Sequence, residues 1–308
     1  MKNRIFWMAA LALGIFFLEV VPAFPRQITI HSEDQFNYAR TRMQEGAYMR
    51  AVEEFERFIR LFPESPDVPE ARCLMGMCYL EAHRYAEARE SLSLVALPDA
   101  TDPLAQKARF LMGESYYREQ KPLKAANYFE QVFKDDPSEA LRDAAAYRLG
   151  WARLRENRWQ EASHSFRRVE RKSPLYNSAL ELERMSLKGM GLPYKSPNQA
   201  GVMAGLLPGL GHAYAGRYRS AIVSFLLNGL FIWATVESFH RDHDILGGVL
   251  AFVEAGWYAG NIYGAVNATH KYNRKLQDDF RKRLNDRFNL RLIASRDGRW
   301  GLSLAVRF

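Results

Sequence analysis

The sequence predicts an all-α protein, in which a solenoid of helical hairpins precedes an α-helical membrane hairpin and a short C-terminal β-hairpin. Three observations predict this order: a 37-residue repeat in the first half, long apolar stretches after residue 199, and an alternating apolar pattern near the C-terminus. The chain has 308 residues, of which 48% are hydrophobic and 25% are charged. This composition is typical of a folded protein with room for two modest domains.

The N-terminus has the pattern of an export signal. Lys2 and Arg4 precede an apolar run over residues 5–18, and small residues around Ala23 suit cleavage by a signal peptidase. We predict a signal peptide over residues 1–23, with an uncleaved anchor as the alternative. In both cases the residues that follow are exported.

Four units with a period of 37 residues cover residues 31–174. The small residues that recur at this period are Ala39, Gly76, Gly113 and Gly150 in one series and Ala51, Ala88, Ala125 and Ala162 in another. Larger apolar residues keep the same step at Phe55, Leu92, Phe129 and Phe166. In a helical hairpin, small residues let the two backbones approach and large residues fill the groove between them. Prolines such as Pro63 and Pro174 then end the units.

This pattern resembles the tetratricopeptide repeat (TPR). The segment EGAYMRAVEEFERFIRLFPESPDVPEA is similar to repeats of bacterial envelope members of this family, namely the repeat lipoprotein of the β-barrel assembly machinery and the Tol-Pal-associated cell-division coordinator. The chain departs from the first because its two cysteines, Cys73 and Cys78, lie inside the repeats and offer no lipid-bearing site. The resemblance implies a scaffold that holds protein or peptide partners. On a concave face formed by the first helix of each repeat, the candidate binding residues are Asn37, Arg40, Tyr79, Tyr116, Tyr117 and Arg153.

Residues 175–198 are predicted to form a capping helix and a linker, and residues 199–269 a membrane domain. Two apolar stretches, 220–239 and 245–269, are long enough to cross about 30 Å of hydrocarbon. A short polar loop separates them, so they predict a transmembrane hairpin. The alternative is a buried Gly- and Ala-rich helix in a soluble domain.

A first apolar stretch, residues 199–216, is interrupted by proline and glycine. We expect a short or re-entrant helix that bends at Pro208 and places His212 and Tyr214 near the interface. If this stretch also crosses, there are three crossings and the positive charges obey the positive-inside rule throughout. If it does not cross, there are two. The pattern P-G-L-G-x-x-Y-x-G-R-Y resembles the start of small TM2-like membrane domains.

The membrane domain also has small residues spaced for close helix packing. Glycines recur every four residues in the last stretch, which favours backbone-to-backbone contact in lipid and predicts a homo-oligomer. The membrane residues selected by the two patterns, together with one intramembrane carboxylate, are Pro208, Gly209, Gly211, Tyr214, Gly216, Glu254, Gly256, Gly260 and Gly264.

The net charge of +8 is concentrated near the C-terminus, where residues 271–299 hold ten Lys or Arg against four Asp. Over residues 270–288, apolar residues recur four apart at Tyr272, Leu276, Phe280, Leu284 and Phe288. This pattern predicts a basic amphipathic helix that lies on anionic lipid headgroups. Nucleic acid is the competing partner, and we expect none because nothing else in the chain resembles a nucleic-acid module.

Residues 289–308 predict a β-hairpin that turns at Asp297-Gly298. The terminal Phe308 after alternating apolar residues resembles the C-terminal signal of outer-membrane barrels.

The sequence contains no phosphate loop, nucleophile elbow or zinc-protease motif. We therefore predict no catalytic residue, no cofactor and no metal. His and acidic side chains over residues 237–244 form a candidate metal site, but a solvated polar loop is the favoured interpretation. Glu254 is a functional candidate because carboxylates inside membranes are costly.

These patterns predict a membrane-anchored TPR scaffold for partners in bacterial envelope assembly or secretion, and not an enzyme. The expected location is the inner membrane with the repeats in the periplasm, and the outer membrane is the alternative. A transport-linked membrane protein with a polar site at Glu254 and His212 is the second hypothesis.

Overall fold

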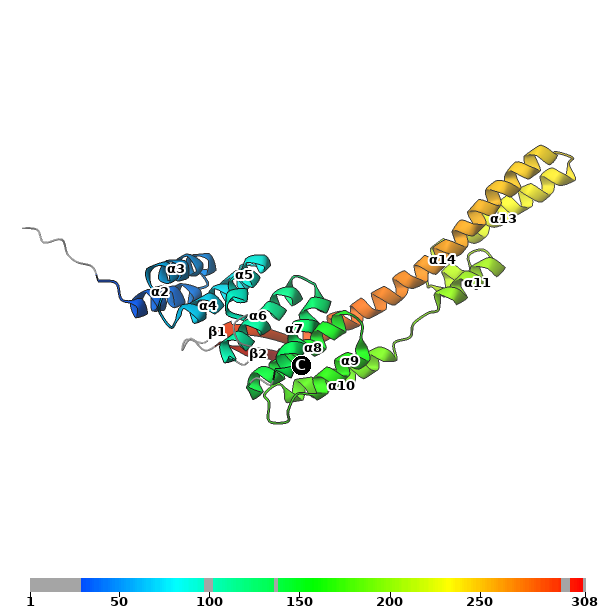
Figure 1. The fold of residues 1–308 in the computed structure, drawn as a ribbon. Coiled ribbons are helices and arrows are strands. Elements are labelled where there is room, and N and C mark those ends of the chain that lie inside the picture. Colours follow the sequence, from blue (N-terminus) through cyan, green and yellow to red (C-terminus); the bar gives the residue numbers. More distant parts are fainter. Residues whose placement is uncertain (1–28, 97–101, 136–137, 295–299, 307–308) are drawn as a thin grey trace, which may run out of the picture.

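A computed structural model describes residues 29–96, 102–135, 138–294 and 300–306. The predicted signal peptide lies outside these residues. Within them the chain is helical except for two strands near its end, so the predicted all-α class is confirmed. Figure 1 shows a stack of short helices, α2 to α10, from which one very long helix, α14, extends and forms a hairpin with α13 at its far end.

The stack consists of antiparallel helix pairs. Its helices are α2 (Ser32–Gln44), α3 (Tyr48–Leu61), α4 (Val68–Glu81), α5 (Tyr85–Ala96), α6 (Pro103–Arg118), α7 (Pro122–Lys134), α8 (Glu139–Arg155), α9 (Trp159–Arg167) and α10 (Tyr176–Met190). Each helix packs against the next along the chain from α2 to α10. The four pairs coincide with the four sequence repeats, and α10 follows them as the expected capping helix.

The repeated glycines hold the two helices of a pair close together. A Cβ added to Gly113 would lie 2.7 Å from Cε1 of Phe129, and one added to Gly150 would lie 2.6 Å from the ring of Phe166. Real Cβ atoms essentially never approach so closely, so a methyl group at either position would force the Phe ring to shift. The predicted pairing of a small residue on one helix with a large residue on the other is confirmed.

The turns inside the repeats share a left-handed backbone residue at the same repeat position. This residue is Gly46 (φ 76°), His83 (59°), Gln120 (61°) and Asn157 (59°) in successive repeats. Glycine adopts this conformation without strain, whereas the other three do so at some cost. The 37-residue period therefore extends to backbone geometry as well as packing.

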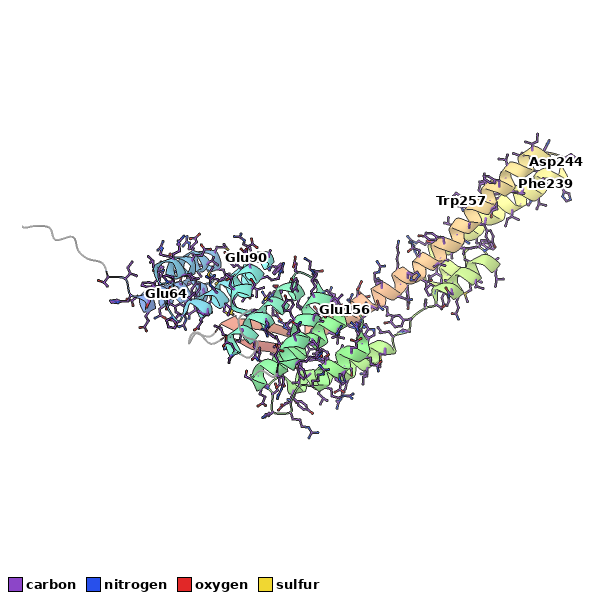
Figure 2. The ribbon with its side chains drawn as sticks, viewed as in Figure 1. Glu64, Glu90, Glu156, Phe239, Asp244 and Trp257 are labelled. Atoms are coloured by element: carbon purple, nitrogen blue, oxygen red, sulfur yellow. The ribbon has the colours of Figure 1, made fainter. Side chains whose placement is uncertain are left out.

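The second part of the molecule contains α11 (Pro197–Leu206), α12 (Leu210–Tyr214), α13 (Tyr218–His240) and α14 (Asp244–Arg287). Helices α13 and α14 pack side by side, and α11 and α12 pack against α14. Figure 2 shows Phe239 and Asp244 at the end of this hairpin farthest from the repeats, and Trp257 farther back along α14.

Helix α14 continues without a break through residue 269, where the sequence suggested that the membrane helix ends and a separate basic helix begins. It has 44 residues and is therefore about 66 Å long at 1.5 Å per residue. No proline or glycine follows Gly264 in this helix, so no residue interrupts it at the boundary. One rigid element thus joins the apolar hairpin to the repeats.

The basic part of α14 does not present its apolar face to a leaflet, and that prediction is wrong. Phe280, Leu284 and Phe288 are 9%, 3% and 3% exposed because they pack into the core of the last repeats. The ring of Phe280 meets that of Trp159 edge-on with centroids 5.6 Å apart. The last hairpin of a solenoid has no following repeat to cover it, and α14 covers part of that surface.

Two strands follow α14 directly. Strand β1 (Phe288–Ala294) pairs antiparallel with β2 (Trp300–Val306), with Phe288 opposite Val306 and Ala294 opposite Trp300. The turn predicted at Asp297-Gly298 lies in the part of the chain that the structure does not describe.

Candidate partner-binding surface and membrane module

The six candidate binding residues are spread along the repeats and do not form one cluster. Asn37 is exposed on α2, and the guanidinium of Arg40 lies 5.8 Å from the ring of Phe36. Arg153 lies on α8, three repeats away. A single compact site made of all six is therefore excluded, although each can still contact an extended partner.

Tyr79, Tyr116 and Arg153 occupy the same position in successive repeats, 37 residues apart. Their side chains face the second helices of the repeats. The ring of Tyr116 stacks on Tyr128 of α7 with centroids 5.4 Å apart, and the Arg89 guanidinium of α5 lies 4.4 Å from the same ring. In the third repeat these aromatic groups fill the groove between α5 and α7.

The fourth repeat lacks this aromatic filling. Arg153 stands where the third repeat has Tyr116, and Ser165 stands where it has Tyr128. At this place the surface has a cavity of about 650 Å³, with Glu130 and Lys134 of α7 on one side and Gln160 of α9 on another. We call it the α7–α9 cavity. A comparison of the repeats outside their signature positions would have found it.

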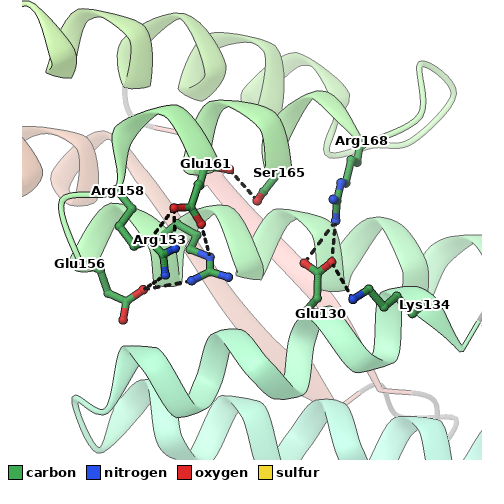
Figure 3. A network of polar contacts seen from close by, with 8 residues as sticks. All are labelled: Glu130, Lys134, Arg153, Glu156, Arg158, Glu161, Ser165 and Arg168. Carbon is green, nitrogen blue, oxygen red and sulfur yellow. Dashed lines mark hydrogen bonds and ion pairs between the residues drawn. The ribbon is translucent and has the colours of Figure 1, made fainter.

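Ion pairs line the α7–α9 cavity (Figure 3). Arg153 lies 3.4 Å from a carboxylate oxygen of Glu156 and 3.4 Å from one of Glu161. Glu130 lies 3.3 Å from Arg168 and 3.6 Å from Lys134. These side chains are partly exposed, so each pair contributes little to stability. They hold charged groups in place around the opening.

The lining of this cavity is more cationic than anionic. Its cationic side chains are Lys134, Arg153, Arg167 and Arg168, and its carboxylates are Glu130 and Glu161. Leu187 and Met190 of α10 also line it and are 43% and 47% exposed. Glu156 and Glu183, outside the lining, pair with Arg153 and Arg167, so the surface combines paired charges with exposed apolar groups.

Tyr117 has a structural environment unlike that of its neighbour Tyr116. It is 7% exposed, and its ring lies 3.8 Å from the guanidinium of Arg155 and 5.3 Å from that of Arg148. Burial raises the pKa of Tyr117, against the opposite effect of these two cations. It is therefore neutral and forms part of the packing between α6 and α8.

A buried ion pair beside Tyr117 was not recognised in the sequence. Arg148 of α8 donates from Nη2 to Glu114 Oε2 of α6 at 2.9 Å, and the two residues are 6% and 0% exposed. Both residues occur in helices rich in charged residues, so nothing in the local pattern distinguishes them. Only the contact between two repeats reveals that they are paired.

The interrupted apolar stretch folds back on itself. The backbone N–H of Ser196, before α11, donates to Tyr214 Oη at 3.0 Å, and Lys195 Nζ donates to the Tyr214 carbonyl at 2.7 Å. Asn273 of α14 also bonds Lys195, donating to its carbonyl at 2.7 Å. The stretch thus begins and ends beside the same part of α14.

The glycines of the interrupted stretch permit this fold. Gly209 has φ 87°, and a Cβ there would collide with the carbonyl of Ala221. A Cβ on Gly211 would collide with the carbonyl of Ala200. Gly216 also has a positive φ of 80° and ends α12. Pro208 precedes Gly209 at the turn.

The structure does not bring Glu254 and His212 together. His212 packs beside Gly264, where an added Cβ would lie 3.2 Å from its ring. Glu254 is ten residues earlier on α14, which corresponds to about 15 Å along the helix. Glu254 is 7% exposed, and its carboxylate has no hydrogen-bond partner among the described residues.

The glycine series on α14 is only partly covered by other helices. Gly264 contacts His212, whereas Gly256 and Gly260 have no neighbour within 4 Å of an added Cβ. The hairpin itself therefore does not use those two glycines for close packing. Within the described ranges, no group of three or more His, Cys, Asp or Glu residues is placed to hold a metal ion.

Comparison with known proteins identifies the repeats. Two tetratricopeptide-repeat family models match residues 42–109 and 110–177. No curated protein matches the sequence. The chain is similar to the MamA protein (16% identity, 52% of this chain and 83% of that one, TM-score 0.44).

Two other solved structures have similar scores. A putative kinesin light chain from Podosopora anserina is 18% identical, over 54% of this chain and 90% of that one, with a TM-score of 0.45. A tetratricopeptide repeat protein from Parabacteroides merdae is 13% identical, over 82% and 98%, with a TM-score of 0.43. Scores this low carry no argument about partners or activity. The family models, together with the helical pairs, show that residues 42–177 are tetratricopeptide repeats.

Proposed function

We propose that this protein is a membrane-anchored scaffold of the bacterial cell envelope, in which the TPR array binds protein partners at a set distance from the bilayer. TPR proteins are in general non-catalytic scaffolds. The observation that carries the proposal is helix α14, which holds an exposed apolar segment at one end and is docked on the repeats at the other.

The apolar side chains of the hairpin support insertion into lipid. Ile245, Phe252 and Leu226 are 87%, 82% and 62% exposed. In the most apolar 18-residue windows of α13 and α14, only 11% and 17% of the residues are buried. A core helix of a soluble protein is mostly buried, and an apolar surface of this size is unfavourable in water.

The fold favours two crossings. Helix α13 starts beside the re-entrant segment, and α14 returns to the same level near Asn273. The repeats and the basic part of α14 then share one side, and the loop at Asp242 lies on the other. The predicted export signal would place the repeats in the periplasm of an inner-membrane protein, with the outer membrane as the alternative. The basic residues then lie outside, against the positive-inside tendency.

For the partner, the α7–α9 cavity favours a protein segment that is acidic and partly apolar. Its partly exposed Lys and Arg side chains can exchange their ion pairs within the chain for carboxylates of a partner, and Leu187 and Met190 offer apolar contact. A homo-oligomer through the open face around Gly256 and Gly260 is a further proposed contact.

Cysteine accessibility in intact cells tests the anchoring. Single cysteines replace Glu64 in the repeats, Asp242 in the loop and Asp279 on α14, and a membrane-impermeant maleimide is added after only the outer membrane is permeabilised. We expect labelling at 64 and 279 but not at 242, and resistance of the protein to alkaline extraction. Labelling at all three positions, with release by alkali, would contradict membrane insertion. Labelling at 64 and 242 but not at 279 would establish three crossings.

A cavity-closing variant tests partner binding. Arg153→Tyr with Ser165→Tyr recreates the stacked pair of the third repeat, so the fold should be retained. A photo-crosslinking residue at Gln160, which lines the cavity, should capture a partner in the wild type and lose it in this variant. The same residue at Glu90, outside the cavity, is the control. Equal capture in both proteins would show that the cavity does not bind the partner.

A further inference from the structure

A second cavity lies where the repeats meet the end of the apolar part of α14. It has a volume of about 570 Å³. Helix α14 contributes His270, Asn273, Arg274, Gln277, Asp278 and Arg281 to its lining, the linker contributes Tyr194, and the repeats contribute Arg155 and Asn157. We call it the junction cavity. No residue of the α7–α9 cavity takes part in it.

The depth of the junction cavity follows from the position of its residues on α14. His270 directly follows the last apolar stretch, and Arg274 lies four residues later, or about 6 Å along the helix. The headgroup region of a bilayer extends about 5–8 Å beyond the hydrocarbon on each side. If the hairpin spans the membrane as proposed above, His270 and Arg274 lie at headgroup depth, and Arg281 lies about 10 Å farther from the hydrocarbon than Arg274.

The charge of the junction cavity is positive. Arg155, Arg274 and Arg281 line it, and Asp278 is the one carboxylate among its lining residues. Asp278 is already bonded to Arg281. Arg274 is exposed, and its side chain makes no hydrogen bond or ion pair with other residues in the described ranges.

Two of the arginines are held in position by the protein backbone. Arg155 donates from Nη1 to the Tyr117 carbonyl at 2.8 Å, and Arg281 donates from Nη1 to the Arg155 carbonyl at 2.6 Å. Their guanidinium groups are therefore ordered before any ligand binds. Ordered arginines present N–H donors that match the oxygens of a phosphate group.

We propose that the junction cavity binds the phosphate-containing headgroup of an anionic phospholipid, with Arg274 as the residue that reaches the lipid and Arg155 and Arg281 as the fixed donors behind it. The inference rests on the proposed membrane insertion. In this proposal the basic part of α14 contacts the leaflet through a cavity with ordered donors, and not by lying flat on it as an amphipathic helix. Lipid bound there would touch both the repeats and α14 and so stabilise their junction.

The test uses the full-length protein in nanodiscs of phosphatidylcholine, with or without one fifth phosphatidylglycerol, and native mass spectrometry of the released protein. We expect retained phosphatidylglycerol in the wild type and about tenfold less in Arg274→Gln, since one charge-assisted contact is lost. Lys275→Gln is the matched control, because it removes the same charge at the same depth from an exposed residue that does not line the cavity.

Three outcomes would overturn the proposal. Equal losses in the two variants would mean general attraction of basic residues to the leaflet. No preference for phosphatidylglycerol in the inserted wild type would mean that the cavity does not recognise the headgroup. If millimolar inorganic phosphate displaced the lipid and also bound in the absence of lipid, the cavity would be a site for the free ion. A protein that fails to enter nanodiscs would instead contradict the membrane anchoring itself.

Discussion

The docking of α14 on the repeats can be tested by Phe280→Ala. Phe280 is 9% exposed and lies in one core with Leu284, Phe288 and the last repeats. Truncation of a buried Phe to Ala costs about 3–5 kcal/mol, and the edge-on contact with Trp159 accounts for about 0.5–1.5 kcal/mol of such a cost. We therefore expect the free energy of opening at this junction to fall by about 3–5 kcal/mol.

Hydrogen exchange of the detergent-solubilised protein measures this change locally. Amides of α9, α10 and residues 277–287 should exchange faster by a factor of at least 100, while those of α2 to α5 should be unchanged because they belong to a separate core. Asp279→Ala, at the exposed neighbouring position, is the control and should leave all rates within about twofold. If Phe280→Ala changed membrane affinity but not exchange in α9 and α10, the helix would lie on the leaflet and the docked arrangement would be refuted.

Other predictions concern the repeats. Gly113→Ala should destabilise the array by about 1–3 kcal/mol in a denaturant titration, because the new methyl group overlaps the buried ring of Phe129. Arg148→Met should cost about 3–5 kcal/mol, because it leaves the buried Glu114 carboxylate with only the longer 3.9 Å contact to Arg118, and Glu114→Gln in the same chain should recover part of that loss. Burial raises the pKa of the Cys78 thiol to about 12, and Glu81 adds to this effect. In the unfolded chain the thiol has its ordinary pKa of about 8.5. The contribution of the Cys78 thiol to the free energy of unfolding is therefore fully present below about pH 8.5 and is lost as the pH rises toward 12. Maleimide should thus leave Cys78 unmodified at pH 7.5 until urea unfolds the protein, and early modification would contradict the burial.

The local features of the repeats follow directly from the sequence. Ala88 and Ala125 recur with the 37-residue period, as do Gly76 and Gly113, and small residues at these positions let the helices pack closely. The long apolar stretches likewise predict the α13–α14 hairpin by length alone. Such features depend on residues within one or two adjacent repeats, so a linear pattern contains them.

Contacts between segments that are far apart in the sequence could not be predicted in this way. The apolar face of residues 270–288 has the same spacing whether it meets lipid or protein, so the sequence could not show that Phe280 would pack on Trp159. The α7–α9 cavity arises from two substitutions outside the signature positions, Arg153 and Ser165, whose side chains face each other only in the folded repeat. The candidate binding residues are predicted from their positions within single helices, and such positions do not reveal that a neighbouring helix covers Tyr117.

The repeating helical pairs, the apolar hairpin and the basic character of the C-terminal region can be predicted from the sequence, because each depends on the type and spacing of nearby residues. Three features became visible only in the folded chain: the interrupted stretch returns to its starting level, α14 runs unbroken from the hairpin to the repeats, and its apolar face covers part of the end of the array. Burial of an apolar face stabilises a fold whichever surface covers that face. Which surface lies within reach is set by the three-dimensional path of the chain.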